Sequence, residues 1–90
     1  MLWIGRGVGQ KFYIDDKLVT LKKVGINNAI INIDGEQHNM TITDGLKIQD
    51  CDCRIILRGT RPSWAEFNFD APKAVKIYRE EINGDIQVRD

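Results

Sequence analysis

Short runs of alternating apolar and polar residues fill most of this chain, and turn-forming residues separate them. A period of two is typical of strands that bury one face, because successive side chains in a strand point to opposite sides. The dipeptide Asp34-Gly35 lies between two such runs and predicts a two-residue type I′ hairpin. The pattern predicts an all-β protein with extended segments at residues 2–4, 11–14, 18–24, 29–33, 36–42, 46–48, 51–57 and 64–69.

One proline marks the connection into the last predicted strand. Pro72 fixes its own φ, removes a hydrogen-bond donor and pushes Ala71 toward extended geometry. Residues 70–73 are therefore predicted to form a tight connection. In the strand expected to follow, alternation places Lys76 and Tyr78 on one face. The other face is predicted to carry Val75, Ile77 and Arg79.

The residues after this strand predict the one helix of the chain. Glu80 and Glu81 suit the first turn of a helix, where negative charge is favourable. Ile82 and Ile86 then stand four positions apart, on one helical face. We therefore expect at most a short helix at the C-terminal end.

Composition limits the kinds of site that the chain can carry. Ninety residues suffice for a single small domain, residues 1–90. The 13 basic and 13 acidic residues cancel, so a nucleic-acid site must be local. Cys51 and Cys53 are too close for an easy disulfide and, with a single histidine, too few for a zinc site; this favours a reducing, cytoplasmic setting. No apolar run has the length of a membrane span, so a soluble protein is expected.

Two motifs at opposite ends of the chain resemble one known family. The chain begins Met-Leu-Trp-Ile-Gly-Arg-Gly-Val-Gly-Gln-Lys-Phe-Tyr-Ile, and residues 71–82 read Ala-Pro-Lys-Ala-Val-Lys-Ile-Tyr-Arg-Glu-Glu-Ile. Over residues 1–16 and 69–82 the chain resembles the carbon storage regulator family (CsrA/RsmA), which are small bacterial post-transcriptional regulators. The resemblance implies a small antiparallel β sandwich or barrel, built in the family as an intertwined homodimer that binds GGA-containing RNA loops.

The resemblance also implies which residues form the RNA site. In the family, each site joins the first strand of one protomer to the last strand of the other. Here the first strand supplies Ile4 and Arg6. The last strand and its connection supply Ala71, Pro72, Val75, Ile77 and Arg79. The implied partner is a single-stranded RNA loop with GGA, and neither a metal nor a cofactor is expected.

Arginine chemistry suits such a site, because the guanidinium fork offers paired donors to a phosphate or a base edge. Arg79 is the first candidate, and the alternative for it is a surface ion pair with Glu80 or Glu81. Arg6 is the second candidate, with a solvated charge at a strand end as the alternative. The family often has another basic residue directly after it, where this chain has Gly7. Weaker phosphate binding is expected from that difference.

The remaining side chains near these motifs have structural explanations. Trp3 and Trp64 are core or interface anchors more often than RNA platforms. Tyr78 is expected to pack across strands, His38 to face solvent and Cys53 to be a small packed residue. Two roles, backbone contact with RNA and core packing, remain open for Ile4, Val75 and Ile77.

The order of the predicted elements occurs twice in the chain. Residues 31–34 read Ile-Asn-Ile-Asp and residues 67–70 read Phe-Asn-Phe-Asp, each ahead of a turn and a further strand. The preceding segments also correspond in order, 12–16 with 46–50 and 18–24 with 51–57. Such self-similarity indicates an internal repeat.

The repeat leads to two hypotheses about assembly. Residues 1–43 and 44–90 can form a single-chain pseudo-dimer with one intact RNA site. Its second site is then degenerate, because residues 35–43 lack the proline and carry Thr43 where the arginine would stand. The alternative is an ordinary homodimer whose chain has gained an insertion.

Two functions remain open. One is translational regulation through RNA, favoured by the Ala-Pro-Lys motif and Arg79. The other is a protein-interaction module that binds a regulator protomer or a flagellar assembly partner, favoured by Gly7 and the zero net charge. An enzyme is not expected, because no nucleophile, metal-ligand or general-base cluster is evident. Salt separates the two functions, since phosphate contacts weaken as salt rises.

Overall fold

The computed structural model describes residues 2–48 and 52–79, and in these residues it contains nine strands and no helix. None of this part of the chain forms a helix that could cross a membrane. The all-β prediction is confirmed. The predicted helix, which would begin at Glu80, lies outside the described residues, and so does Cys51. The strands are β1 Leu2–Gly7, β2 Lys11–Ile14, β3 Lys17–Gly25, β4 Asn28–Ile33, β5 Glu36–Thr41, β6 Gly45–Ile48, β7 Cys53–Arg61, β8 Trp64–Asp70 and β9 Ile77–Arg79.

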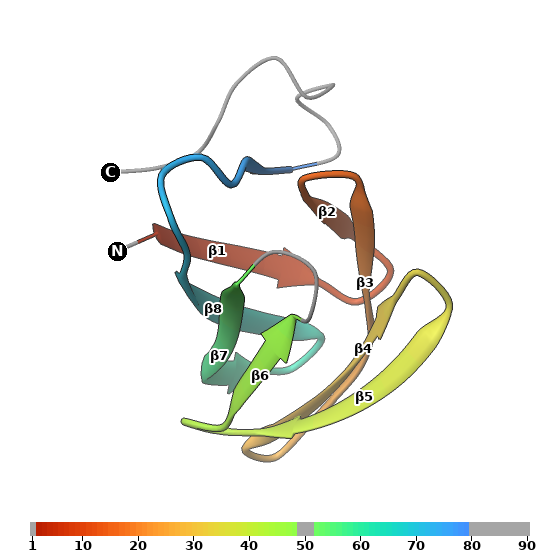
Figure 1. Ribbon diagram of the computed structural model, residues 1–90. Coiled ribbons are helices and arrows are strands. Elements are labelled where there is room, and N and C mark those ends of the chain that lie inside the picture. The colour runs from red at the N-terminus through yellow and green to blue at the C-terminus, as the bar shows by residue number, and fades with distance from the viewer. Residues whose placement is uncertain (1, 49–51, 80–90) are drawn as a thin grey trace.

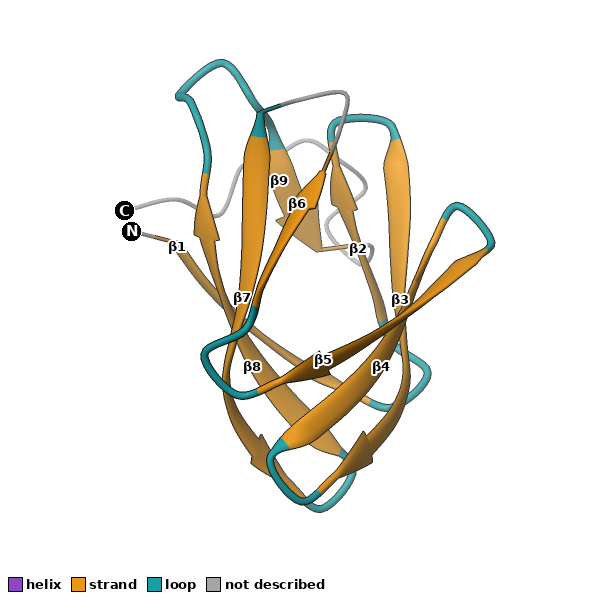
Figure 2. Ribbon diagram, turned by 60° about the horizontal axis from the view of Figure 1, so that its bottom comes forward, coloured by secondary structure: helices purple, strands orange, loops and turns teal. Residues whose placement is uncertain are grey.

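Two antiparallel sheets form a small β sandwich (Figure 1). One sheet has four strands in the order β1-β8-β7-β6, and the other has five in the order β5-β4-β3-β2-β9. Figure 2 shows the two groups of strands from a second direction. Aromatic side chains join the sheets, because the ring of Phe12 on β2 lies 5.9 Å from that of Phe67 and 5.4 Å from that of Phe69, both on β8.

Alternate residues of each strand face the space between the sheets, as the sequence pattern predicted. Along β4 every second side chain is buried, and β7 begins with the same alternation. Cys53 is buried in this core and acts as a packed residue. The largest fully buried side chains include Phe12, Phe67, Ile4, Leu21, Ile31, Met40, Ile55, Leu57 and Ile77.

The first and last strands each complete the sheet built by the opposite half of the chain. β1 pairs with β8 from Leu2↔Phe69 to Gly7↔Trp64. β9 pairs with β2, with Arg79 opposite Phe12. Neither sheet is therefore complete with the residues of one half alone.

The hairpins β3–β4 and β7–β8 have the same construction. The first strand of each has nine residues. The pairing shifts at a bulge between Leu21 and Lys23 in β3, and between Leu57 and Gly59 in β7. Each hairpin turns through two residues, and the second of them has a φ of 60° in both cases, at Asn27 and Ser63. The two hairpins thus correspond position by position.

The Asp34-Gly35 turn has the predicted type I′ character. Ile33 pairs with Glu36 across it, and both central residues have positive φ, 49° for Asp34 and 89° for Gly35. The Asp34 carboxylate also accepts a hydrogen bond from the Leu18 backbone N–H at 3.0 Å. This turn sets the pairing of β4 with β5.

A Gly35→Ala substitution is expected to lower the free energy of unfolding by about 1 to 2 kcal/mol, because an L-residue is strained at positive φ. A steric clash does not contribute to this loss, since a Cβ at Gly35 would meet no atom within 4 Å. Gly59→Ala is the matched control, with equally open space and without a positive φ. Urea unfolding of both variants measures the difference, and equal losses would contradict the backbone explanation.

The last strand begins later than predicted. The Val75 backbone N–H donates to the Pro72 carbonyl at 3.0 Å and closes a turn, so regular pairing starts only at Ile77. Two hydrogen bonds then hold Lys76 against Asp15, one to the Asp15 carboxylate at 2.9 Å and one from the Asp15 backbone N–H at 2.6 Å. Val75 still faces the core, as its predicted face requires.

Candidate RNA interface

Arg6 lies on the inner face of β1 and is only 5% exposed. Its Nε donates to the Gly5 carbonyl at 2.9 Å, and a terminal nitrogen donates to the Lys11 carbonyl at 3.1 Å. The alternative of a solvated charge at a strand end is therefore wrong. The guanidinium instead ties β1 to the first residue of β2.

Arg79 lies at the end of β9, opposite Phe12 in the pairing with β2. Phe12 directly follows Lys11, the residue whose carbonyl Arg6 contacts. Arg6 and Arg79 are thus attached to consecutive residues of β2, although they come from opposite ends of the chain. Figure 1 shows β9 running beside β2 at one end of the molecule. The structure brings these two predicted residues together with Lys11.

Tyr78 packs across strands, as predicted. Its ring stacks on that of Tyr13, with centroids 5.2 Å apart and planes at 24°. Its hydroxyl donates to the Asp15 carbonyl at 3.3 Å. The ring therefore stabilises the pairing of β9 with β2, and that face of Tyr78 is covered by Tyr13.

The three apolar residues of the predicted site, Ile4, Val75 and Ile77, have their side chains in the core. Their buried side chains are therefore not available to a ligand, and the Val75 backbone N–H is already bonded to the Pro72 carbonyl. β1 and β9 are each the last strand of their sheet within the described residues. One side of each strand therefore has no strand neighbour there, and unpaired backbone groups can recognise base edges.

Ala71 and Pro72 lie apart from the two arginines. Ala71 is partly buried against the core, and Pro72 is exposed. Both line a hollow of about 420 Å³ whose wall contains neither Arg6 nor Arg79. The other residues of this wall are Lys47, Asp52, Cys53, Arg54 and Asp70.

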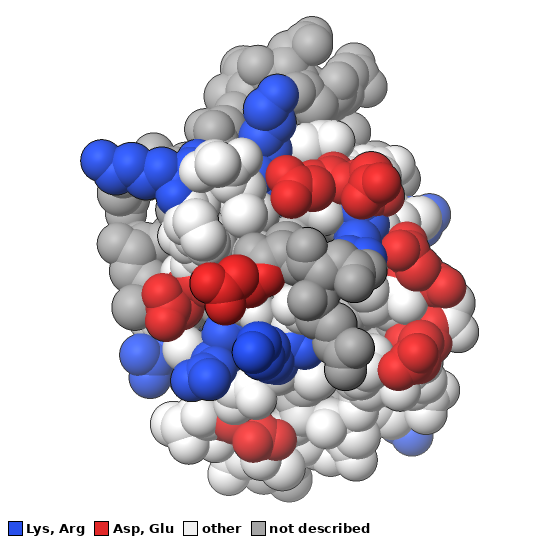
Figure 3. All heavy atoms as spheres, in the orientation of Figure 1, with Lys and Arg blue, Asp and Glu red and all other residues white. Residues whose placement is uncertain are grey.

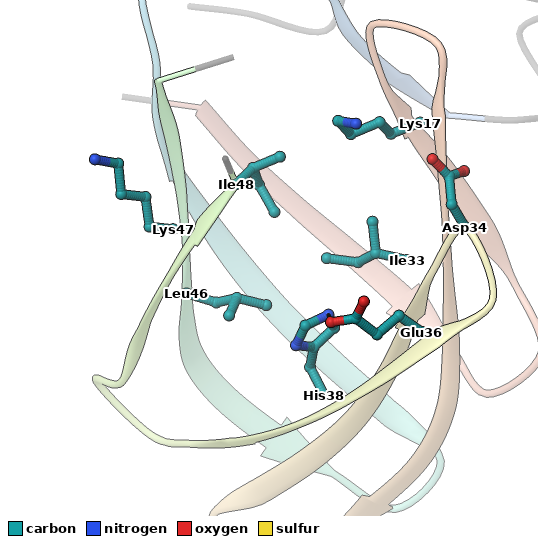
Figure 4. A pocket seen from close by; sticks show the side chains of 8 residues that line it. All are labelled: Lys17, Ile33, Asp34, Glu36, His38, Leu46, Lys47 and Ile48. Carbon is teal, nitrogen blue, oxygen red and sulfur yellow. Dashed lines mark ion pairs between the residues drawn. The ribbon is translucent and has the colours of Figure 1, made fainter. Parts of the chain in front are cut away.

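A second hollow, of about 470 Å³, lies between β5 and β6, where the degenerate site was predicted. Figure 4 shows Leu46 and Ile48 of β6 and Ile33 of β4 directed into it. His38 lines this hollow and is a quarter exposed, and its Nε2 lies 3.4 Å from the Glu36 carboxylate, so His38 faces solvent only in part. No arginine is among the described residues that line this hollow.

Sequence reasoning missed the exposure of both tryptophans. Trp3 is 51% exposed and Trp64 is 37% exposed, so neither is a core anchor, while the alternative role of an interface anchor stays a prediction. The indole ring of Trp64 lies over Gly5, where a Cβ would overlap it. The alternation of β1 contained a signal for this, since Trp3, Gly5 and Gly7 occupy the face opposite Ile4.

Comparison of the chain with protein-family models, with curated proteins and with solved structures found no match. Within residues 2–48 and 52–79, no group of three or more His, Cys, Asp or Glu side chains is placed to hold a metal ion. The geometry of the described residues and the sequence motifs are therefore the basis for assigning a function.

Proposed function

We propose that the chain is an RNA-binding post-transcriptional regulator that recognises GGA-containing single-stranded loops. One observation carries this proposal: β1 and β9, from opposite ends of the chain, bring Arg6 and Arg79 to the start of β2. Both strands end their sheets in the described part of the chain. This arrangement supplies the partly exposed guanidinium of Arg79 beside strand edges that have no strand neighbour there, while the buried Arg6 holds β1 to β2.

We also propose that the chain is a single-chain pseudo-dimer of the CsrA-like type. The exchange of β1 and β9 between the halves is the arrangement expected of an intertwined dimer whose two protomers are joined. The matched bulges and turns of the two long hairpins support an internal repeat. In the repeat, β6 corresponds to β2. The edge of β6 has no strand neighbour in the described residues, whereas β2 pairs with β9. We therefore expect one RNA site per chain.

The proposed mechanism divides the work between side chains and backbone. Arg79 is partly exposed and contacts a phosphate or a base through its guanidinium fork. Arg6 is held by the Gly5 and Lys11 carbonyls and fixes the position of β1 relative to β2. The outer edges of the two strands, which have no strand neighbour in the described residues, read the edges of guanine and adenine, because a single-stranded loop exposes them.

Titration of the chain against a hairpin RNA with GGA in its loop tests the proposal. A hairpin with the same stem and a loop that lacks GGA is the control. We expect loop-dependent binding with one RNA per chain, and weaker binding at higher salt because phosphate contacts release counterions. Equal affinity for both loops would contradict the proposal. Light scattering of the free protein tests the pseudo-dimer, which requires the mass of one chain.

The hollow beside β6 supports a second candidate function, a protein-interaction module. The edge of β6 is without a strand neighbour in the described residues, and Ile33, Leu46 and Ile48 supply apolar side chains beside it. Such an edge can pair with an extended segment of a partner. A partner bound in this way would be held nearly independently of salt, in contrast to RNA.

Gly7→Arg is expected to strengthen RNA binding, because it places a new cation at the end of β1, on the face opposite Arg6 and across from Trp64, where it adds a phosphate contact. The slope of log affinity against log salt should steepen by about 0.7 for single-stranded RNA. A Cβ at Gly7 would lie 3.3 Å from the Gln10 side-chain oxygen, which accepts the Gly7 N–H. Gly7→Ala controls for that contact. An unchanged salt slope in Gly7→Arg would contradict this prediction.

A further inference from the structure

The outer face of the four-stranded sheet carries a row of arginines along β7. Arg54 and Arg58 are exposed on this strand, while Cys53, Ile55 and Leu57 between and before them are buried. Strict alternation would direct Arg61 inward. The bulge between Leu57 and Gly59 shifts the alternation by one residue, so that Arg61 is exposed on the same face.

Both tryptophans of the chain lie on this face. Trp3 projects from β1 and Trp64 from β8, at exposures of 51% and 37%. Trp64 lies over Gly5, and Gly5 is the next residue after Trp3 on that side of β1. Both indole rings therefore lie on the same face, and Gly5 separates Trp3 from the ring of Trp64 along β1.

Strand pairing places one arginine opposite Trp64, and a side-chain hydrogen bond links a second arginine to the strand partner of Trp3. Arg61 stands directly opposite Trp64 across β7 and β8. Arg58 donates from Nε to the side-chain oxygen of Asn68, and Asn68 is the strand partner of Trp3. Residues directly opposite in an antiparallel pair have Cβ atoms about 5 Å apart. Arg61 is thus the direct neighbour of Trp64, whereas Asn68 separates Arg58 from Trp3.

Positive charge outweighs negative charge on the outer face. Figure 3 shows Lys and Arg side chains gathered over β6 and β7. Lys47 of β6 pairs with Arg54 and adds to the arginine row. Three acidic residues, Glu66 and Asp70 of β8 and Asp52 before β7, lie beside these cations, against the four basic residues Lys47, Arg54, Arg58 and Arg61.

We propose that this outer face is a platform that binds single-stranded RNA without sequence preference. The platform consists of Trp3, Trp64, Arg58, Arg61, Arg54 and Lys47. Bases stack on the two indole rings, and the arginines of β7 hold the phosphates. Stacking tolerates any sequence because every base has a π-face, and a cationic row tracks the backbone. The platform lies on the outer face of its sheet and shares β1 with the GGA site, which uses the edges of β1 and β9. The platform stands whether or not the GGA site binds RNA. Where both are used, it holds nucleotides that flank the loop.

Intrinsic fluorescence tests the platform directly, because the chain contains two tryptophans and both lie on this face. Oligouridylate, which contains no GGA, is the probe. We expect saturable quenching of the native chain by oligouridylate, with an affinity that falls as salt rises. The absence of quenching at low salt would overturn the proposal.

Variants then locate the binding, with a labelled oligouridylate and fluorescence anisotropy as the readout. Trp64→Ala should weaken binding about 10-fold, the effect of losing one base stack, while Trp64→Phe should retain most of the affinity. Arg61→Ala should also weaken binding. Lys22→Ala is the matched control, because Lys22 is an exposed cation at the corresponding bulge of β3. Equal affinities of Trp64→Ala and the native chain would overturn the proposal, as would an equal loss in Lys22→Ala.

The GGA site is tested apart from the platform in the same assay. Arg79→Ala should leave oligouridylate binding unchanged if the platform is separate. A loss of oligouridylate binding in Arg79→Ala, with none in Trp64→Ala, would overturn the platform and leave the GGA site standing. A loss of oligouridylate binding in Trp64→Ala but not in Arg79→Ala, together with unchanged GGA-hairpin binding in Arg79→Ala, would overturn the GGA site alone.

Discussion

Arg79→Ala is expected to weaken binding of a GGA hairpin RNA about 10- to 100-fold, the effect of losing hydrogen bonds that involve a charged group. Arg79 lies at the end of β9 beside the start of β2, where Arg6 is already held by backbone carbonyls. It is therefore the cation of this corner that is best placed to contact the ligand. Fluorescence anisotropy of a labelled hairpin measures the affinity.

Two further variants separate the role of Arg79 from general charge. Arg79→Lys keeps the positive charge but loses the planar fork, so we expect an affinity between those of the native chain and Arg79→Ala. Lys76→Ala removes an exposed cation three residues earlier, whose backbone is held by Asp15, and should change the affinity little. An equal loss in Arg79→Ala and Lys76→Ala would show that only net charge matters.

Phe12→Ala is expected to lower the free energy of unfolding by about 3 to 5 kcal/mol, because it leaves a cavity in a fully buried position. The ring of Phe12 is 0% exposed and contacts both Phe67 and Phe69 of the opposite sheet. A small domain has only about 5 to 15 kcal/mol of stability, so this one change removes a large part of it. Urea unfolding followed by circular dichroism measures the loss.

Tyr13→Ala is the matched control for this prediction. Tyr13 neighbours Phe12 on β2 but faces outward and stacks on Tyr78. Loss of an aromatic pair of this kind is worth about 1 kcal/mol beyond the area that it buries. A loss in Phe12→Ala no greater than that in Tyr13→Ala would mean that the sheets do not pack through Phe12.

The strands and the Asp34-Gly35 hairpin could be predicted from the sequence because local rules determine them. Alternation of apolar residues sets which face of a strand is buried, and it held along β4. A type I′ turn needs positive φ at both central residues, which Asp and Gly tolerate. These properties depend on neighbours in the chain and so are visible without a structure.

The environment of single side chains depends on segments far away in the sequence, and there the predictions were less successful. Trp64 is exposed because Gly5, on a strand from the other end of the chain, provides a surface for its ring. Arg6 is buried because the Lys11 carbonyl accepts its hydrogen bond. The outward direction of Arg61 depends on a bulge, and the sequence pattern alone gave no sign of it.

The exchange of β1 and β9 has a consequence for how the chain folds during its synthesis. β1 leaves the ribosome first but gains its partner only when β8 has been made, and β2 waits for β9. Contacts between such distant segments slow folding, and strand edges that wait for partners are prone to aggregate. The two long hairpins can form early because their contacts are local. Neither sheet can be completed before translation has passed β8, and the second requires Arg79.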